Sequence, residues 1–338
     1  MATPRILVVR LSAIGDTIQT MPVACALRDR FPQAFLAWAV ESRAAALVRG
    51  HPAIDELIEL PRGWLQSPGG AWRLRRRLRA MRFDVTVDVQ SLTKSAILAR
   101  LTGAPRRIGF GHPGGRELSR WFNNERVDPK AAHVVDCYLE LLRPLGIESP
   151  TVRFDVPERD EDRATADAMI RQLAVDAGFA MVTPGAGWPS KLWPADRYSA
   201  VIRHLHASWG RPTVVVWAGG SERLLAERIT VSAAPAARVS PPTTLPQLAS
   251  LARRARLFLG SDTGPLHLAA AVDTPCVGLY GPWPASRHGP YGPHNIALQQ
   301  MIFDGPTRRR RTASPIYMES ITTELVCEAC DKILQDFS

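Results

Sequence analysis

The stretch 257–271 combines residue types that can bind an anion. It begins as an apolar, strand-compatible run and continues from Gly264 as a helix-compatible run. Asp262 and Thr263 are favoured helix N-cap residues, and the free N–H groups and dipole at a helix start attract phosphate. His267 lies in the first turn, where it would face the same anion. The pattern predicts a phosphate site, with an ordinary capped helix and a packed histidine as the alternative.

A second candidate anion loop, residues 185–191, follows another apolar run and ends in Lys191. Lys191 would reach a pyrophosphate as a point charge, with an ordinary surface lysine as the alternative. Glu222 stands at a helix start just past a strand, where it would accept hydrogen bonds from a ribose diol or merely cap the helix. Neither loop has the glycine pattern of a dehydrogenase or the Gly-Lys-Ser/Thr of an NTPase, so both classes lose their main support.

Asp16 is the candidate general base. It follows the apolar run 5–11 through a short turn in which Gly15 keeps the backbone slim. The end of such a strand faces the ligand crevice of an open α/β sheet, so an acceptor hydroxyl would approach the carboxylate. Capping of the helix that continues from Thr17 is the alternative role.

These candidate side chains stand where apolar runs end and helical patterns begin. Such alternation predicts parallel sheets with helices on both faces. The pattern changes near residue 158, where a run of acidic residues suits the first turn of a helix. We therefore predict an α/β protein of two doubly wound, Rossmann-like domains, 1–158 and 159–322, that face each other across a cleft. The predicted strands are 5–11, 35–40, 54–60, 84–89, 179–183, 213–217, 257–261 and 276–280.

Composition agrees with two globular domains. The 338 residues include 42 Lys and Arg against 32 Asp and Glu, a formal net charge of +10, which predicts an anionic partner. Five scattered cysteines are too few for a disulfide framework and favour a reducing cytoplasm. Cys327 and Cys330 lie in a helical pattern, where we expect structural cysteines and a metal or redox site is the alternative. Because no run of about 18 apolar residues occurs, no membrane span is predicted.

Two basic segments lie outside the phosphate loops. Residues 72–82 form an arginine-dense helical pattern, and residues 106–120 form a Gly- and Arg-rich segment that we expect to be a mobile loop over the substrate. A solvated face is the ordinary interpretation of the first, and docking on anionic lipid is the alternative. A nucleic-acid binder is a further class, but the chain lacks interleaved aromatic residues that stack on bases, so we predict no nucleic-acid partner.

Four motifs, in this order, resemble those of the ADP-heptose:lipopolysaccharide heptosyltransferases. They are Ser-Ala-Ile-Gly-Asp at 12–16, Lys-Leu-Trp-Pro at 191–194, Gly-Gly-Ser-Glu at 219–222 and Ser-Asp-Thr-Gly-Pro-Leu-His at 261–267. The stretch 88–96 looks like the heptosyltransferase I branch in particular. The resemblance implies the GT-B fold, with the helix in 323–338 packing back on the N-terminal domain.

The resemblance also implies residue roles. Asp16 would be the catalytic base, Asp262 would face the donor sugar and Glu222 the ribose. The residues that would hold the donor diphosphate are Lys191, Thr263, Gly264 and His267. The residues expected to contact the acceptor are Ser12, Gln90, Lys94, Arg106 and Arg107. Residues 186–190 depart from the family, which often places hydroxyl residues shortly before the lysine, and this leaves the identity of the donor open.

The implied activity is inverting transfer of heptose, or a related sugar, from a nucleotide donor such as ADP-heptose to a lipopolysaccharide inner-core acceptor of the Kdo–lipid A type. A carboxylate would take the acceptor proton while a lysine and a helix N-terminus stabilise the departing diphosphate, so we expect neither a metal nor another cofactor. A nucleotide-sugar epimerase of the same fold, acting without a lipid acceptor, is the alternative. We expect a cytoplasmic enzyme whose lipid-linked acceptor would bring it to the anionic cytoplasmic face of the inner membrane.

Overall fold

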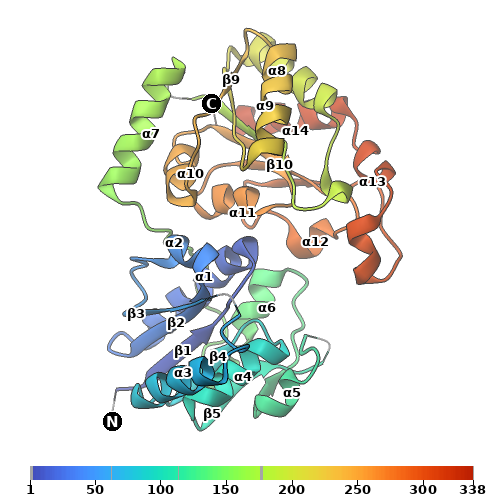
Figure 1. Ribbon diagram of the computed structural model, residues 1–338. Coiled ribbons are helices and arrows are strands. Elements are labelled where there is room, and N and C mark those ends of the chain that lie inside the picture. The colour runs from blue at the N-terminus through green and yellow to red at the C-terminus, as the bar shows by residue number, and fades with distance from the viewer. Residues whose placement is uncertain (1–2, 62, 113, 176–177, 338) are drawn as a thin grey trace. The chain divides into compact units, whose positions relative to one another are not determined.

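The computed structural model describes residues 3–61, 63–112, 114–175 and 178–337. The chain divides into two compact units, Met1–Pro157 and Glu158–Ser338. Each unit is built around one six-stranded sheet (Figure 1). Every neighbouring pair of strands in both sheets is parallel.

The first unit has the strand order β3-β2-β1-β4-β5-β6. Its strands are β1 (Arg5–Val9), β2 (Phe35–Glu41), β3 (Glu56–Leu60), β4 (Val85–Asp88), β5 (Arg106–Phe110) and β6 (Glu125–Val127). Its helices are α1 (Ile14–Arg30), α2 (Ser42–Val48), α3 (Pro68–Ala80), α4 (Thr93–Thr102), α5 (Ser119–Phe122), α6 (Val134–Glu140) and the 3-10 helix η1 (Arg143–Leu145).

The second unit has the order β12-β11-β10-β7-β8-β9. Its strands are β7 (Ala180–Thr183), β8 (Thr213–Val215), β9 (Ala237–Val239), β10 (Leu257–Ser261), β11 (Cys276–Leu279) and β12 (Ile296–Leu298). Its longer helices are α7 (Asp160–Leu173), α8 (Ala195–Trp209), α9 (Gly220–Ser232), α10 (Leu245–Ala252), α11 (Gly264–Ala271) and α14 (Thr323–Asp336). Its short helical segments are η2 (Pro189–Lys191), α12 (Ala285–His288), η3 (Thr307–Thr312) and α13 (Ile316–Glu319).

The two sheets have the same connectivity. Read from its other edge, the second order is β9-β8-β7-β10-β11-β12, which repeats the first order strand for strand. This is the dinucleotide-binding order, in which the chain reverses direction between the first and fourth strands and leaves a ligand crevice beyond their carboxyl ends. The crevices therefore lie after β1 and β4 in one unit and after β7 and β10 in the other. The predicted α/β fold class is confirmed.

Both cores follow from continuous apolar strands. Parallel strands covered on both faces need apolar residues at successive positions, and Leu7, Val8 and Val9 of β1 are all fully buried. On one face, alternate residues of β1 and β2 form a cluster with Leu78 of α3 and Leu98 of α4. In the second unit, strands β7, β10 and β11 form the corresponding cluster with α8, α9 and α14.

Helix α14 belongs to the second unit. Val326, Cys330 and Ile333 are buried in that unit's core, and its Asp331 carboxylate accepts hydrogen bonds from Trp209 Nε1 at 2.7 Å and His204 Nε2 at 2.9 Å. The apolar side of this helix is therefore covered by α8 and the second sheet. Among the described residues, no helix is both long and apolar enough to cross a bilayer.

Candidate active site

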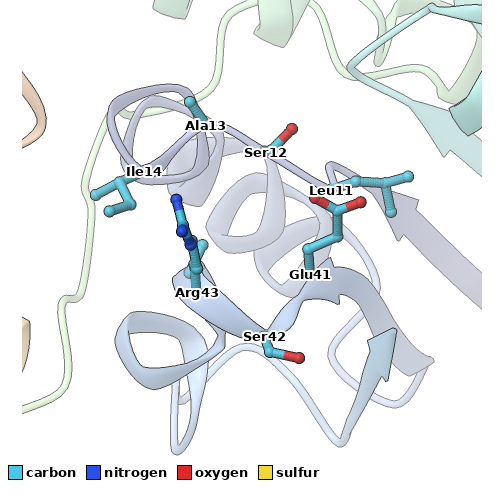
Figure 2. Close-up of a pocket in the computed structure, with 8 residues that line it drawn as sticks. Leu11, Ser12, Ala13, Ile14, Glu41, Ser42 and Arg43 are labelled. Atoms are coloured by element: carbon cyan, nitrogen blue, oxygen red, sulfur yellow. The ribbon is translucent and has the colours of Figure 1, made fainter. Parts of the chain in front are cut away.

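One acceptor candidate of the first unit, Ser12, lines a pocket at the carboxyl ends of β1 and β2. The pocket has a volume of about 270 Å³ and is lined by residues 11–14 and 41–44. Figure 2 shows the Glu41 carboxylate next to Leu11, and the Arg43 side chain directed toward Ala13 and Ile14. The turn that leads to Asp16 thus forms one wall of the pocket.

Asp16 lies in the first turn of α1, and three groups hold its carboxylate. Arg10 Nη2 is 2.7 Å from Oδ2, the backbone N–H of Ala13 donates to the same oxygen at 3.2 Å, and the Tyr138 hydroxyl donates to Oδ1 at 3.3 Å. The contact with Ala13 is a helix cap, so the capping role is real. The side chain is still 36% exposed, which leaves the carboxylate accessible to a proton donor.

Arg10 holds the Asp16 carboxylate from the buried side. Its side chain is 7% exposed, it donates to the carbonyl of Val89 at 3.2 Å, and it lies 5.2 Å from the centre of the Tyr138 ring. Burial works against the charged form of Arg10, but Asp16, Tyr138 and Asp88 together outweigh burial and raise the pKa of the guanidinium. Asp16 therefore faces a buried positive charge.

Asp88 is the last residue of β4 and is fully buried. Its carboxylate accepts hydrogen bonds from the backbone N–H of Ser91 at 2.9 Å and from Asn123 Nδ2 at 3.0 Å. Burial dominates and raises the pKa of Asp88 to about 6. Among the described residues, Asn123 Oδ1 is buried without a hydrogen-bond partner. The amide could therefore turn over and accept a hydrogen bond if a donor replaced the carboxylate.

Three acceptor candidates lie at this same edge of the sheet. Ser12 lines the pocket. Gln90 Oε1 accepts from the backbone N–H of Leu11 at 2.8 Å and so fixes the end of β1 to the end of β4. Lys94 forms an ion pair with Glu41, which also lines the pocket. The structure thus brings Ser12, Gln90 and Lys94 together around the turn before Asp16.

Arg106 and Arg107 do not belong to this group. They begin β5, so they lie at the opposite, amino end of the sheet, and four strand steps of about 3.3 Å put Arg106 about 13 Å from Phe110 along β5. Arg106 pairs with Glu125 at 2.6 Å, and Arg107 donates to the carbonyls of Phe122 and Ala104. Both guanidinium groups brace the sheet. The loop predicted to start at residue 106 begins instead as strand β5, which occupies 106–110. The contact of Arg106 and Arg107 with the acceptor stays a prediction.

In the second unit, Asp262 contacts both Lys191 and His267. Lys191 Nζ lies 2.5 Å from Asp262 Oδ2 and donates to its carbonyl at 2.8 Å, and His267 Nε2 lies 3.1 Å from Oδ1. Burial would raise the pKa of Asp262, but the hydrogen bond from His267 and the charge of Lys191 hold it well below its usual range. The lysine and histidine are therefore preassembled, and a third N–H of the ammonium remains for another acceptor.

The start of α11 offers further donors. Thr263 is the N-cap residue and Gly264 the first helical residue, but the Thr263 side chain makes no capping hydrogen bond. Its hydroxyl is buried and, within the described part of the chain, has no hydrogen-bond partner. A buried hydroxyl beside the N–H groups of a helix start is what an oxyanion would satisfy. The predicted cap is thus wrong for the side chain, while the anion-binding geometry is present.

Glu222 reaches the other phosphate-type loop. Its Oε2 accepts from the backbone N–H of Ala218 at 2.8 Å, so the carboxylate does cap the start of α9. It also lies against Gly185: a Cβ at that position would be 2.2 Å from Glu222 Cδ. Only glycine leaves room for this approach. Loop 185–191 and the end of β8 therefore meet at Glu222, the predicted ribose contact.

Sequence reasoning missed several supporting aromatic groups. Trp193 is buried, donates to the carbonyl of Ile321 at 2.9 Å and stacks edge-on to Tyr198 at 4.9 Å, which fixes the segment after Lys191. Lys191 Nζ also lies 4.2 Å from the centre of the Trp283 ring. The position of Trp283, just after the predicted strand 276–280, was the available signal. Nothing in the sequence pointed to Tyr138 as a partner of Asp16.

The chain matches a known protein family. A family model for glycosyltransferase family 9, the heptosyltransferases, matches residues 71–317. The chain belongs to glycosyltransferase family 9. This confirms the predicted family and the predicted enzyme class, a glycosyltransferase, and supports transfer over the epimerase alternative. Among the described residues of this family 9 enzyme, no group of three or more His, Cys, Asp or Glu side chains could hold a metal ion.

Individual relatives cover most of this glycosyltransferase. Lipopolysaccharide heptosyltransferase 1 of Pseudomonas aeruginosa is 28% identical over 303 residues, which span 87% of this chain and 83% of that protein. Lipopolysaccharide heptosyltransferase 1 of Escherichia coli K12 is 27% identical over 305 residues, 87% of this chain and 93% of that protein. The structure of E. coli heptosyltransferase WaaC with ADP superposes with a TM-score of 0.77 at 25% identity, covering 97% of this chain and 99% of that one.

Proposed function

We propose that this glycosyltransferase moves heptose from ADP-heptose to a lipopolysaccharide inner-core acceptor of the Kdo–lipid A type, with inversion at the anomeric carbon. The observation that carries the proposal is the preassembled Lys191–Asp262–His267 cluster at the start of α11, in a chain of the heptosyltransferase family. Relatives named as lipopolysaccharide heptosyltransferase 1, and the WaaC structure with ADP, support the donor and the acceptor class.

The second unit supplies the donor site in this proposal. The diphosphate would accept hydrogen bonds from the Thr263 hydroxyl and the backbone N–H groups at the start of α11, with Lys191 and His267 beside them. As the glycosidic C–O bond breaks, negative charge grows on the leaving diphosphate, and fixed donors stabilise it without reorganising. Glu222 would accept hydrogen bonds from the ribose hydroxyls, and the Asp262 carboxylate would face the sugar while holding the lysine and histidine in place.

The first unit supplies the base. An acceptor hydroxyl in the pocket beside residues 11–14 would give its proton to the Asp16 carboxylate as its oxygen attacks the anomeric carbon. Arg10 and Tyr138 orient the two carboxylate oxygens. Ser12, Gln90 and Lys94 would position the acceptor, either directly or by shaping the turn.

Helix α3 is our candidate for contact with the anionic acceptor or with the membrane that holds it. Only Leu78 of this helix is buried, Trp72 is 58% exposed, and Arg76 lies 5.1 Å from the Trp72 ring. Arg77 pairs with Glu56, so part of its charge is already compensated. An arginine-rich helix with an exposed tryptophan suits the headgroup region of an anionic bilayer. The proposal thus places the enzyme at the cytoplasmic face of the inner membrane.

A transfer assay tests the proposal directly. Purified protein is incubated with ADP-heptose and Kdo–lipid A in mixed micelles, and mass spectrometry follows the acceptor while a coupled assay follows ADP. The expected result is ADP release matched by an acceptor heavier by one heptose. UDP- and GDP-sugars serve as matched donors that should react much more slowly. Conversion of ADP-heptose to an epimer in the absence of acceptor would instead establish the epimerase alternative.

A further inference from the structure

The second unit carries a surface loop, residues 301–317, that the donor site does not use. We call it the arginine loop because η3 contains four consecutive arginines, Arg308–Arg311. The rings of Phe303 and Tyr317 join its two ends, with centroids 5.5 Å apart and planes at 72°. A compact surface segment whose ends are packed together frequently carries a function. Figure 1 shows α13, which contains Tyr317, near the red end of the colour scale.

Two contacts of Arg311 hold the arginine loop to the body of its unit. The Arg311 guanidinium lies 4.3 Å from the centre of the Trp188 ring, and its carbonyl accepts a hydrogen bond from Ser190 Oγ at 3.1 Å. Trp188 and Ser190 immediately precede Lys191. The loop is therefore held next to the donor-site lysine, while Arg308 and Arg309 remain exposed.

The charge of the arginine loop is mostly uncompensated. In the described part of the chain, none of the arginines 308–311 forms an ion pair, and Asp304 is the loop's one acidic residue. Four neighbouring positive charges repel each other and destabilise the loop unless an anionic surface faces them. The composition of the loop therefore indicates an anionic partner.

Exposed aliphatic side chains flank the same loop. Ile302 is 85% exposed and Ile316 is 51% exposed. They directly precede Phe303 and Tyr317, whose stacking brings both isoleucines to the base of the loop. Phosphate groups of nucleic acid or of a small ligand would pair with the arginines but gain nothing from isoleucine. A bilayer surface uses both, because headgroup phosphates bind arginine and the acyl boundary accepts aliphatic side chains.

We propose that the arginine loop docks the second unit on an anionic phospholipid surface. The arginines contact headgroup phosphates, and Ile302 and Ile316 insert at the acyl boundary. This contact is separate from α3, which belongs to the first unit. It goes beyond sugar transfer, since it assigns a membrane-binding role to the unit that holds the nucleotide.

Cosedimentation with vesicles tests the electrostatic part. The full chain is mixed with vesicles of phosphatidylcholine alone or of phosphatidylcholine with an equal part of phosphatidylglycerol, in about 0.1 M salt, where charges act over about 10 Å. The double variant Arg308→Gln/Arg309→Gln should bind the anionic vesicles about 30-fold more weakly, since each arginine near such a surface contributes about 1 kcal/mol. The matched control Arg171→Gln/Arg228→Gln removes two exposed charges from α7 and α9 and should bind like the unaltered protein. Equal losses in both double variants would overturn the proposal, because net charge alone would then explain binding.

The apolar part has its own test. Ile302→Ser/Ile316→Ser should weaken binding to the anionic vesicles at least tenfold, while Leu224→Ser/Val231→Ser, which alters side chains that are 68% and 78% exposed on α9, should not. Unchanged binding of the isoleucine variant, or displacement of the protein from vesicles by duplex DNA through the same two arginines, would contradict docking on lipid. The vesicle experiments contain neither donor nor acceptor. A negative result in them therefore says nothing against the proposed transfer reaction. A negative transfer assay, in turn, says nothing against binding to vesicles.

Discussion

Replacement of Asp16 by asparagine separates its proposed role as the base from its contact as a helix cap. In the native protein, one carboxylate oxygen accepts from Arg10 and Ala13 and the other from Tyr138. The asparagine oxygen can keep the contacts with Arg10 and Ala13, and its NH₂ group can donate to the Tyr138 hydroxyl. The variant therefore keeps the shape and the cap but cannot accept the acceptor proton.

The expected magnitudes differ between rate and stability. Loss of a positioned general base lowers kcat by about 100-fold to 10,000-fold. The stability loss is smaller: a neutral acceptor replaces a charged one at Arg10, which costs about 1 kcal/mol at a side chain that is 36% exposed. Affinity for ADP should not change, because the proposed donor contacts all belong to the second unit.

The assay measures kcat with saturating donor and acceptor, together with urea unfolding and ADP binding by calorimetry. Arg10→Gln is the matched control, since it breaks the same ion pair but keeps the carboxylate, and its kcat should fall by less than about tenfold. If Asp16→Asn and Arg10→Gln lowered kcat equally, the carboxylate would act only by holding the turn in place, and its assignment as the base would be refuted.

Three further predictions follow from single contacts. Lys191→Ala should weaken ADP binding by about 1–3 kcal/mol, the range for a hydrogen bond to a charged group, and unchanged affinity in calorimetry would remove Lys191 from the site. Asp88 has a pKa of about 6 in the folded chain, against about 3.9 for an unfolded aspartate. Between these two pH values the folded state binds more protons than the unfolded state. The free energy of unfolding therefore falls by about 3 kcal/mol as the pH rises from the lower value to the higher. Asp88→Asn should abolish this slope in urea titrations from pH 4.5 to 6.5, and an unaltered slope would assign it to another group. Gly185→Ala would place a Cβ 2.2 Å from Glu222 Cδ and should weaken ADP binding severalfold by displacing that carboxylate. The control Gly187→Ala, whose new Cβ would have no atom within 4 Å, should bind ADP normally. Equal ADP affinities of the two variants would show that Glu222 does not contact the nucleotide.

The strands and helices that the sequence predicted correctly are those whose residue pattern is set by neighbouring residues in the chain. A buried parallel strand needs consecutive apolar residues, and the run that became β10 has them, followed at once by glycine and proline suited to start α11. Strands β6, β9 and β12 are only three residues long and include exposed positions, so they carry no comparable run. Their existence depends on pairing at the sheet edge, which a linear pattern does not encode.

In the candidate site too, local sequence patterns predicted some residues, whereas contacts between distant residues could not be predicted. Lys191, Asp262 and His267 were found because each stands beside a strand-to-helix turn. The Tyr138 contact joins residues 122 positions apart, and no local pattern announces it. The place of Arg106 and Arg107 in the sheet could not be predicted for a related reason: only the register of β5 with β4 shows that they lie at the amino end of the sheet.

The position of α14 makes the unit with the proposed donor site one uninterrupted segment of the chain. Because this helix completes the core of its own unit, the polypeptide passes from one unit to the other once, between Pro157 and Glu158. A single crossover there exchanges the whole second unit. If the proposed sites are right, recombination between relatives combines the acceptor site of one with the donor site of another in one event.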